Sequence, residues 1–304
     1  MDKKHKSHQR ALQSERQDHG EKASEGAGKL YVVATPIGNL GDISARALAV
    51  LAEVDLVAAE DTRTTGHLLA HHGITAKFVA LHEHNEMARA EELVAQMRAG
   101  KTIALASDAG TPGISDPGAL LVARARAAGV EVCPIPGANA AIAALSAAGL
   151  SEPHFLFYGF LPAKAAARRG ALAGLRELSC ALVFYEAPHR VTECVADLAA
   201  TLGAEREIVI ARELTKLYES IHRCRLGEAG AWLAADPNRL RGEFVLIVTG
   251  ALAQKPEGLP PEAERVLRLL LAELPLAQSA ALAAAITGVR KNELYQRALA
   301  LRDE

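Results

Sequence analysis

A glycine- and proline-rich segment at residues 107–118 (SDAGTPGISDPG) constrains the fold of this chain more than any other stretch. It follows a short apolar run at residues 102–106 (TIALA), which is typical of a buried strand. The glycines and prolines end that strand and favour a tight loop at its carboxyl end, and a helical pattern then covers residues 119–128. In open α/β sheets such loops bind ligands, so we interpret the segment as a ligand-binding loop, with a plain connector as the alternative.

Two further loops repeat this arrangement. Residues 35–42 (TPIGNLGD) follow the apolar run LYVVA, and residues 134–139 (PIPGAN) follow a short strand pattern at residues 130–133. Strand and helix patterns alternate through residues 30–150. This alternation predicts a largely parallel α/β domain that carries the three loops at the carboxyl ends of its strands.

The rest of the chain has different patterns. Residues 1–29 are almost wholly polar, and we predict that they form a disordered tail. Residues 151–254 carry strand patterns with several short links, which indicates a mixed sheet in a second α/β domain. Residues 255–304 carry helical patterns, and we expect a small helical module that resembles a helix-turn-helix. The predicted fold class is therefore α/β, with two α/β domains and a C-terminal helical module.

Composition and charge narrow the choice of partners and location. The net charge of −2 means that local basic patches would have to bind any nucleic acid. The four cysteines have no CxxC spacing, which is typical of reduced thiols in a cytosolic protein. No stretch approaches the ~18 consecutive apolar residues of a membrane span, and the start has no hydrophobic signal region, so we expect neither membrane insertion nor export. His71, His72, His82 and His84 lack supporting Cys or carboxylate spacing, and no metal site is predicted.

The three loops are poor in groups that bind phosphate. They contain almost no Lys or Arg, and Pro36, Pro112 and Pro136 each remove one backbone N–H donor. We therefore expect a ligand that is apolar to moderately polar and is held by carbonyl oxygens, by shape and by a carboxylate. S-adenosylmethionine has these properties, because it combines a flat base and a ribose with a sulfonium that favours oxygen atoms.

A series of unusual strings then identifies a family. They are LYVVATPIGNLGDISARAL, AAEDTRTTGHLL, LHEHNE, ASDAGTPGISDPG, PIPGANAAIAALSAAGL, FYGFLPAK, FYEAPHR and ARELTKLYESI. Together they resemble the ribosomal RNA methyltransferases of the tetrapyrrole methylase superfamily. The resemblance implies a cofactor cleft between two α/β domains and S-adenosylmethionine-dependent 2′-O-methylation of a cytidine in the decoding region of 16S rRNA. It also implies a cytoplasmic homodimer, with 16S rRNA or the 30S subunit as its partner.

The same resemblance assigns the cofactor group, whereas the catalytic and RNA groups are charged residues that we expect near the inferred cleft. The catalytic group is Glu60, Asp61, Arg63 and Glu186, with no proton acceptor chosen among them. The cofactor group is Pro36, Ile37, Asp108, Gly110, Thr111, Pro112, Ile114, Pro136, Gly137, Ala138, Tyr185 and Ala187. The RNA group is Lys164, Arg168, Arg169, Arg190, Lys216, Arg290 and Lys291.

The adjacent carboxylates Glu60 and Asp61 leave two interpretations open. In the first, one carboxylate orients Arg63 while the other accepts a proton from the ribose hydroxyl. In the second, Asp61 caps the helix that follows and has no chemical role. Methyl transfer to a hydroxyl depends mainly on positioning, so either interpretation is compatible with activity.

Two other functions are compatible with the sequence. Another methyltransferase of the same superfamily would act on a small tetrapyrrole or on a protein substrate that carries diphthine. A non-catalytic RNA-binding module would use the helical tail, and it would bind no S-adenosylmethionine.

Overall fold

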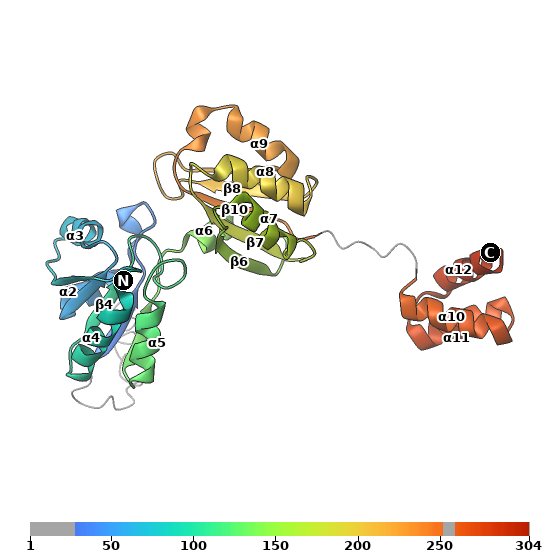
Figure 1. Ribbon diagram of the computed structural model, residues 1–304, viewed down its shortest axis with the longest axis horizontal. Coiled ribbons are helices and arrows are strands. Elements are labelled where there is room, and N and C mark those ends of the chain that lie inside the picture. The colour runs from blue at the N-terminus through green and yellow to red at the C-terminus, as the bar shows by residue number, and fades with distance from the viewer. Residues whose placement is uncertain (1–27, 252–258, 304) are drawn as a thin grey trace, which may run out of the picture. The chain divides into compact units, whose positions relative to one another are not determined.

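The computed structural model describes residues 28–251 and 259–303 (Figure 1). Most of the tail predicted to be disordered, residues 1–27, lies outside these ranges. The chain divides into two compact units, with the division after Gly250. The first unit holds two five-stranded sheets, and the second holds helices alone among its described residues.

The first sheet is entirely parallel, with strand order β3-β2-β4-β1-β5. Its strands are β1 (Lys29–Val33), β2 (Leu56–Ala59), β3 (Phe78–Ala80), β4 (Ile103–Ala106) and β5 (Glu131–Ile135). The four residues of β4 are all buried, as a central strand that is covered on both faces requires. The expected parallel α/β domain is confirmed.

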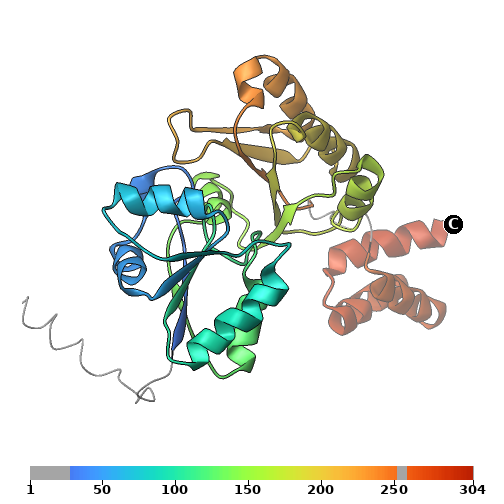
Figure 2. The ribbon, with the colours of Figure 1, turned by 60° about the vertical axis from the view of Figure 1, so that its left-hand side comes forward.

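Helices cover both faces of this sheet. One face packs against α2 (Ala45–Glu53) and α3 (Thr62–His71), where Leu51 and Leu69 are buried. The other face packs against α4 (Glu86–Arg98) and α5 (Ala119–Ala127) through Leu93 and Leu121. Figure 2 shows the sheet between these two layers. This arrangement leaves the strand ends and their loops free of helical cover.

The second sheet is mixed, with strand order β6-β7-β10-β8-β9. Its strands are β6 (Phe155–Phe160), β7 (Ala181–Glu186), β8 (Glu207–Arg212), β9 (Ser220–Arg225) and β10 (Phe244–Val248). Only β6 and β7 pair in parallel, and the other neighbours are antiparallel. A short link permits the antiparallel pairing of β8 with β9, whereas β10 pairs with β7 and β8 after the chain has passed through α9.

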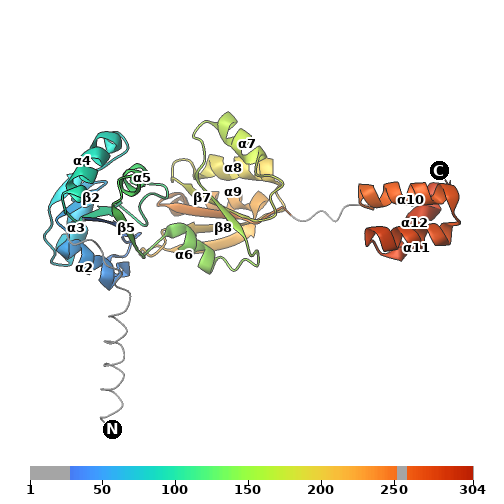
Figure 3. The same cartoon turned by 90° about the horizontal axis from the view of Figure 1, so that it is seen from below.

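The two faces of the second sheet are covered by helices from different parts of the chain. One face packs against α7 (Ala165–Ala173), α8 (Val191–Leu202) and α9 (Leu226–Ala234). The other face packs against α6 (Ala140–Ala147), as Figure 3 shows. The boundary predicted at residue 150 assigns α6 to the first domain, yet its small buried residues Ala141 and Ala144 pack against the second sheet. The segment from β5 to α6 thus connects the two sheets.

A buried ion pair joins α7 to α8. The Arg168 side chain is 1% exposed, and its Nε donates to Asp197 Oδ2 at 2.6 Å. The guanidinium also donates to the carbonyl oxygen of Ala163. A guanidinium held in this way cannot reach RNA phosphates, so we withdraw Arg168 from the RNA group. The neighbouring Arg169 is half-exposed and shares Asp197.

The second unit contains α10 (Pro261–Glu273), α11 (Leu276–Thr287) and α12 (Lys291–Asp303) around a small apolar core. Leu267 and Leu294 are fully buried in that core. The Ser279 hydroxyl donates to carbonyl oxygens at the end of α10, which fixes the turn into α11. Gly288 ends α11 with a left-handed φ of 74°. This three-helix arrangement agrees with the expected helical module.

Candidate functional site

Loops at the carboxyl ends of β1 and β4 are joined by backbone hydrogen bonds. The N–H of Thr35 donates to the carbonyl oxygen of Gly110 at 2.8 Å, and the N–H of Gly110 donates back at 3.1 Å. The buried Thr35 hydroxyl donates to the carbonyl oxygen of Ser107. The Thr111 hydroxyl then donates to the carbonyl oxygen of Ala138 in the loop after β5. The three predicted loops therefore form one connected surface.

Glycine is required where the loop at residues 107–118 ends. Gly118 has φ = +126°, and a Cβ there would lie 2.6 Å from Leu105 Cδ2. Glu86 Oε1 fixes the start of α5 by accepting the N–H groups of Gly118, Leu120 and Leu121 at 2.9, 3.0 and 3.3 Å. Carboxylates stabilise helix N-termini in this way, so the loop is anchored at its far end.

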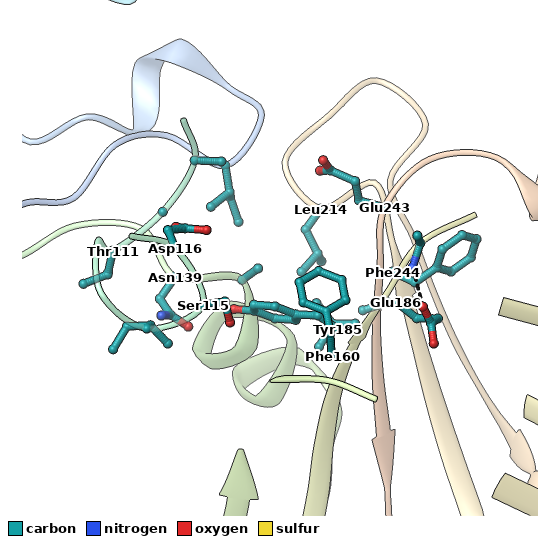
Figure 4. A pocket seen from close by; sticks show the side chains of 18 of the residues that line it. Thr111, Ser115, Asp116, Asn139, Phe160, Tyr185, Glu186, Leu214, Glu243 and Phe244 are labelled. Atoms are coloured by element: carbon teal, nitrogen blue, oxygen red, sulfur yellow. Dashed lines mark hydrogen bonds between the residues drawn. The ribbon is translucent and has the colours of Figure 1, made fainter. Parts of the chain in front are cut away.

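A cavity of about 340 Å³ lies between these loops and the second sheet. Figure 4 shows its two sides: Thr111, Asp116 and Asn139 come from the loops, and Phe160, Tyr185 and Leu214 come from the second sheet and its connections. The remaining lining residues include Ile37, Gly110, Ile114, Ala140, Ala187, Ala211, Glu243 and Val245. This volume is typical of a small-molecule site. We name it the first cavity.

The first cavity suits a cation better than an anion. None of the described residues that line it is Lys or Arg. Burial raises the pKa of Asp116, and the nearby Asp108 charge adds to this rise, while a hydrogen bond with Ser107 opposes it. A half-buried carboxylate without a basic partner favours a positively charged ligand. Apolar walls beside one such carboxylate fit the adenine, ribose and sulfonium of S-adenosylmethionine.

Adjacent residues at the end of β7 point to opposite faces of the sheet. The Tyr185 hydroxyl lies on the α6 side and accepts the N–H of Ala141 at 3.1 Å. Glu186 points away from Tyr185 (Figure 4) and is fully buried beside Arg190 on α8, with Oε1 3.2 Å from Arg190 Nε. Burial, followed by the Glu186 charge, raises the pKa of the Cys194 thiol. Glu186 therefore belongs to a buried charged cluster and is also among the residues that line the first cavity.

The carboxylates that follow β2 are connected to the loop after β4. The N–H of Asp108 donates to Glu60 Oε2 at 3.3 Å, and the N–H of Asp61 donates to Asp108 Oδ1 at 3.0 Å. Burial raises the pKa of Glu60, and the charges of Asp116 and Asp108 add to the rise. Asp61 instead caps α3, and hydrogen bonds from Arg63 hold its pKa at about 2. Asp61 thus caps α3, as the second interpretation expects, and also holds the Arg63 guanidinium, as the first one expects; its chemical role stays a prediction.

A second cavity of about 460 Å³ adjoins the first one. Its described lining residues are Pro36, Ile37, Gly38, Leu40, Thr64, Thr65, His67, Leu68, Ser107, Asp108, Ala109, Lys216 and Glu243. The two cavities share Ile37, Ala109 and Glu243. Ligands in the two cavities would therefore both contact these three residues.

The loop between β8 and β9, which we call the hairpin loop (residues 213–219), contacts the loop after β1. Thr215 Oγ1 accepts the N–H of Asn39 at 3.0 Å. Glu213 and Thr215 both have positive φ, 53° and 65°, which is strained for residues with a side chain. Lys216 Nζ lies 2.8 Å from both Glu213 Oε1 and Glu243 Oε2. Partial burial lowers the pKa of Lys216, but these two hydrogen bonds outweigh that effect, so its ammonium form is stabilised.

The predicted cofactor residues divide into those that line a cavity and those that shape the loops. The first cavity is lined by Ile37, Gly110, Thr111, Ile114, Tyr185 and Ala187. Pro36 and Asp108 line the second cavity. Neither cavity includes Pro112, Pro136, Gly137 or Ala138 among its lining residues. Their assignment to the cofactor stays a prediction.

Several lining residues were not singled out from the sequence. They are Ser115, Asp116, Phe160, Leu214, Glu243 and Val245. For Asp116 a signal existed, because the residue belongs to the glycine-rich loop itself. Leu214 and Glu243 had no such signal, because they reach the cavity only through the pairing of β8 with β10.

The described residues contain neither a candidate metal site nor a candidate membrane-spanning helix. Residues 28–251 and 259–303 contain no cluster of three or more His, Cys, Asp or Glu suited to a metal ion. Within the same ranges, no helix has the length and hydropathy needed to cross a membrane.

Two family comparisons match separate parts of the chain. The Tetrapyrrole (Corrin/Porphyrin) Methylases match residues 29–230, and the RsmI C-terminal HTH domain matches residues 257–302. Among curated proteins, the ribosomal RNA small subunit methyltransferase I of Escherichia coli O157:H7 is 55% identical over 277 residues, or 91% of this chain and 96% of that protein. The protein of the same description from Pseudomonas aeruginosa is 56% identical over 276 residues, or 90% of this chain and 97% of that protein.

Solved structures show the same fold at low identity. A cobalt precorrin-4 methyltransferase matches with a TM-score of 0.57 at 16% identity, over 76% of this chain and 98% of that chain. The uroporphyrin-III C-methyl transferase from Thermus thermophilus, solved with S-adenosyl homocysteine, matches with a TM-score of 0.53 at 19% identity, over 74% of this chain and 98% of that chain. Such identities support the fold alone.

Proposed function

The chain belongs to the tetrapyrrole methylase family, and we propose that it methylates the 2′-hydroxyl of a cytidine in the decoding region of 16S rRNA. It is a methyltransferase, and its cofactor is S-adenosylmethionine, as the motifs predicted. The choice of rRNA is carried by one observation: relatives that are more than half identical over about nine tenths of the chain are small subunit rRNA methyltransferases.

The decisive assay uses the pure protein, labelled S-adenosylmethionine and 30S subunits from a strain that lacks the enzyme. We expect label in 16S rRNA, and mass spectrometry of the nucleosides should identify 2′-O-methylcytidine. A porphyrinoid and a diphthine-bearing protein serve as alternative acceptors. Label in either of these, with none in rRNA, would contradict the proposal and favour another activity of the superfamily.

We assign the first cavity to the cofactor, which supplies an electrophilic methyl group when bound. Asp116 supports this assignment, because a half-buried carboxylate without a basic partner attracts the sulfonium. An Asp116→Asn variant should bind S-adenosylmethionine about ten-fold more weakly, since an opposite charge nearby typically stabilises a charged group by one pKa unit or more. Its affinity for S-adenosylhomocysteine, whose sulfur carries no charge, should change much less. Equal losses for both ligands in calorimetry would argue against this site.

We propose that Glu60, one of the predicted catalytic residues, acts by positioning Asp108. Its carboxylate accepts the N–H of Asp108, whose side chain lines the second cavity. A Glu60→Gln variant should reduce kcat about ten-fold while the dissociation constant of S-adenosylmethionine stays unchanged. Asp61→Asn is the control, because Asp61 caps α3 and its side chain lines neither cavity. Equal kcat values in wild type and Glu60→Gln would remove Glu60 from the catalytic group.

Exposed basic residues support binding to RNA. Lys164 directly precedes α7, Arg169 lies on it, and Arg290 and Lys291 lie at the start of α12. Lys216 of the hairpin loop is partly buried and is paired with Glu213 and Glu243. Arg190 is partly buried and donates to the carbonyl oxygen of Leu161. Phosphate contacts of this kind position RNA without reading its sequence, so binding should weaken as salt increases.

We propose a homodimer with β6 at its interface, in the cytoplasm where the subunits are assembled. β6 is an edge strand, and Phe155, Tyr158 and Phe160 on it are 48%, 39% and 53% exposed. Exposed aromatic side chains on an unpaired strand favour association. Light scattering should report a dimer for wild type and a monomer for Tyr158→Lys, with Leu178→Lys as an exposed control elsewhere. A wild-type monomer would contradict this part of the proposal.

A further inference from the structure

The second cavity differs in chemistry from the first one. Thr64, Thr65 and His67 on α3 line one side, and Lys216 of the hairpin loop lines another. The first cavity has no Lys or Arg among its described lining residues. Asp108 and Glu243 line it as well, and Glu243 pairs with Lys216. Hydroxyl, imidazole, carboxylate and ammonium groups together suit a polar ligand with hydroxyls and ring nitrogens. The volume of about 460 Å³ is within the usual range of ligand sites.

The residues that line both cavities, which we call the shared wall, place the second cavity next to the site of methyl transfer. Ile37, Ala109 and Glu243 line both cavities. Direct methyl transfer requires that donor and acceptor atoms approach each other in line. With the cofactor in the first cavity, the acceptor must therefore enter from a space that opens onto the same wall.

Thr65 provides an independent sign of a ligand. The residue is 2% exposed, and its Oγ1 is buried without a hydrogen-bond partner. A buried hydroxyl without a partner destabilises a fold, and such groups are uncommon in native proteins. The chain carries this one in the wall of a cavity, where a bound molecule can supply the missing partner.

We propose that the second cavity receives the acceptor nucleoside after it leaves its stack in the RNA, an inference that rests on the proposed rRNA methyltransferase function. Thr65 Oγ1 hydrogen-bonds the nucleoside, and the Lys216 ammonium exchanges its contact with Glu243 for the adjoining phosphate. Enzymes that do chemistry on a stacked base extrude its nucleotide into such a pocket, and we extend this principle to a ribose hydroxyl. The nucleoside is held with its ribose toward the shared wall.

Thr65→Val tests the hydroxyl with little change in shape. Steady-state methylation of unmodified 30S subunits, at saturating labelled S-adenosylmethionine, should show a KM for subunits raised about three- to ten-fold. Calorimetry should show unchanged affinity for S-adenosylmethionine alone. The melting temperature should equal or exceed that of wild type, because the variant removes a buried oxygen without a partner. Thr192→Val, an exposed change on α8, is the control.

Lys216→Met supplies a second test, with the exposed Lys101→Met as its control. It should lower kcat/KM for subunits at least ten-fold and leave S-adenosylmethionine affinity unchanged. Wild-type KM in Thr65→Val would overturn the inference, and so would a lowered melting temperature, which would mean that the hydroxyl serves the fold. If wild type itself transfers no methyl group to 30S subunits, the proposed function fails and the inference fails with it.

Discussion

Gly38→Ala tests the contact between the loop after β1 and the hairpin loop. A Cβ at Gly38 would lie 2.5 Å from Lys216 Cγ, 2.8 Å from Thr215 Oγ1 and 3.0 Å from the carbonyl oxygen of Leu214. The lysine stem cannot simply rotate away, because its Nζ is held by Glu213 and Glu243. The Leu214 carbonyl belongs to the backbone. The hairpin loop must therefore shift.

The expected destabilisation follows from these contacts. Overpacking typically costs about 1–3 kcal/mol, and weakening of the Asn39–Thr215 hydrogen bond adds about 1 kcal/mol. Replacing glycine reduces the entropy of the unfolded chain and returns about 0.4–1 kcal/mol. The net loss is then about 1–3.6 kcal/mol. For a unit of this size it corresponds to a melting temperature lower by roughly 2–14 °C.

Urea unfolding and thermal melting measure the loss, and hydrogen exchange at the Asn39 amide reports the shift directly. Methylation of 30S subunits should fall, because Lys216 moves with the hairpin loop. Gly66→Ala is the matched control: it lies within α3 with no atom within 4 Å of the new Cβ, and it should stabilise the protein by about 0.5–1 kcal/mol. The reasoning is refuted if Gly38→Ala is as stable and as active as wild type.

Three further predictions concern charged side chains. Arg168→Met should destabilise the protein by about 3 kcal/mol in urea unfolding, because it leaves Asp197 without its buried partner. Arg169 is half-exposed, so Arg169→Met should cost less than about 1 kcal/mol. Similar losses in the two variants would contradict this prediction. Asp61 has a lowered pKa of about 2, so its contribution is fully present above pH ~4 and is lost as pH falls through about 2. The urea midpoints of wild type and Asp61→Asn should therefore approach each other as pH falls below about 4 and converge only below about pH 2. Burial raises the pKa of Asp116, so Asp116→Asn should raise the melting temperature at pH 8, and the gain should disappear below pH ~4; a constant gain at every pH would be contrary evidence.

Much of the architecture could be predicted from local patterns. Residues 102–106 read as a strand, and the glycines after them indicated a loop; β4 and the positive φ of Gly110, Gly113 and Gly118 agree with this. These features depend on neighbouring residues in the sequence. The packing of α6 against the second sheet could not be predicted in this way, because its alanine-rich pattern suits either sheet.

The site was harder to predict from the sequence, because the pairing of strands that are far apart in the chain brings its residues together. Leu214 and Glu243 come together through the register of β8 and β10, in which Arg212 lies opposite Phe244. Asp116 and Asp108 share one loop, and only the turns between them decide which one lines which cavity. Arg168 is an instructive error: it lies four residues before the buried Leu172 on α7, so helical spacing already placed it on the buried face.

The single oxygen of Glu86 that accepts three N–H groups has a consequence for the energetics of ligand binding. With the Thr35–Gly110 pair at the near end and Glu86 at the far end, the intervening backbone is ordered before any ligand arrives. The cofactor then meets a preorganised surface, and little of its affinity is lost to freezing the main chain. In a Glu86→Asp variant the loop would be ordered only when the cofactor binds, and the entropic cost of ordering it would weaken cofactor binding.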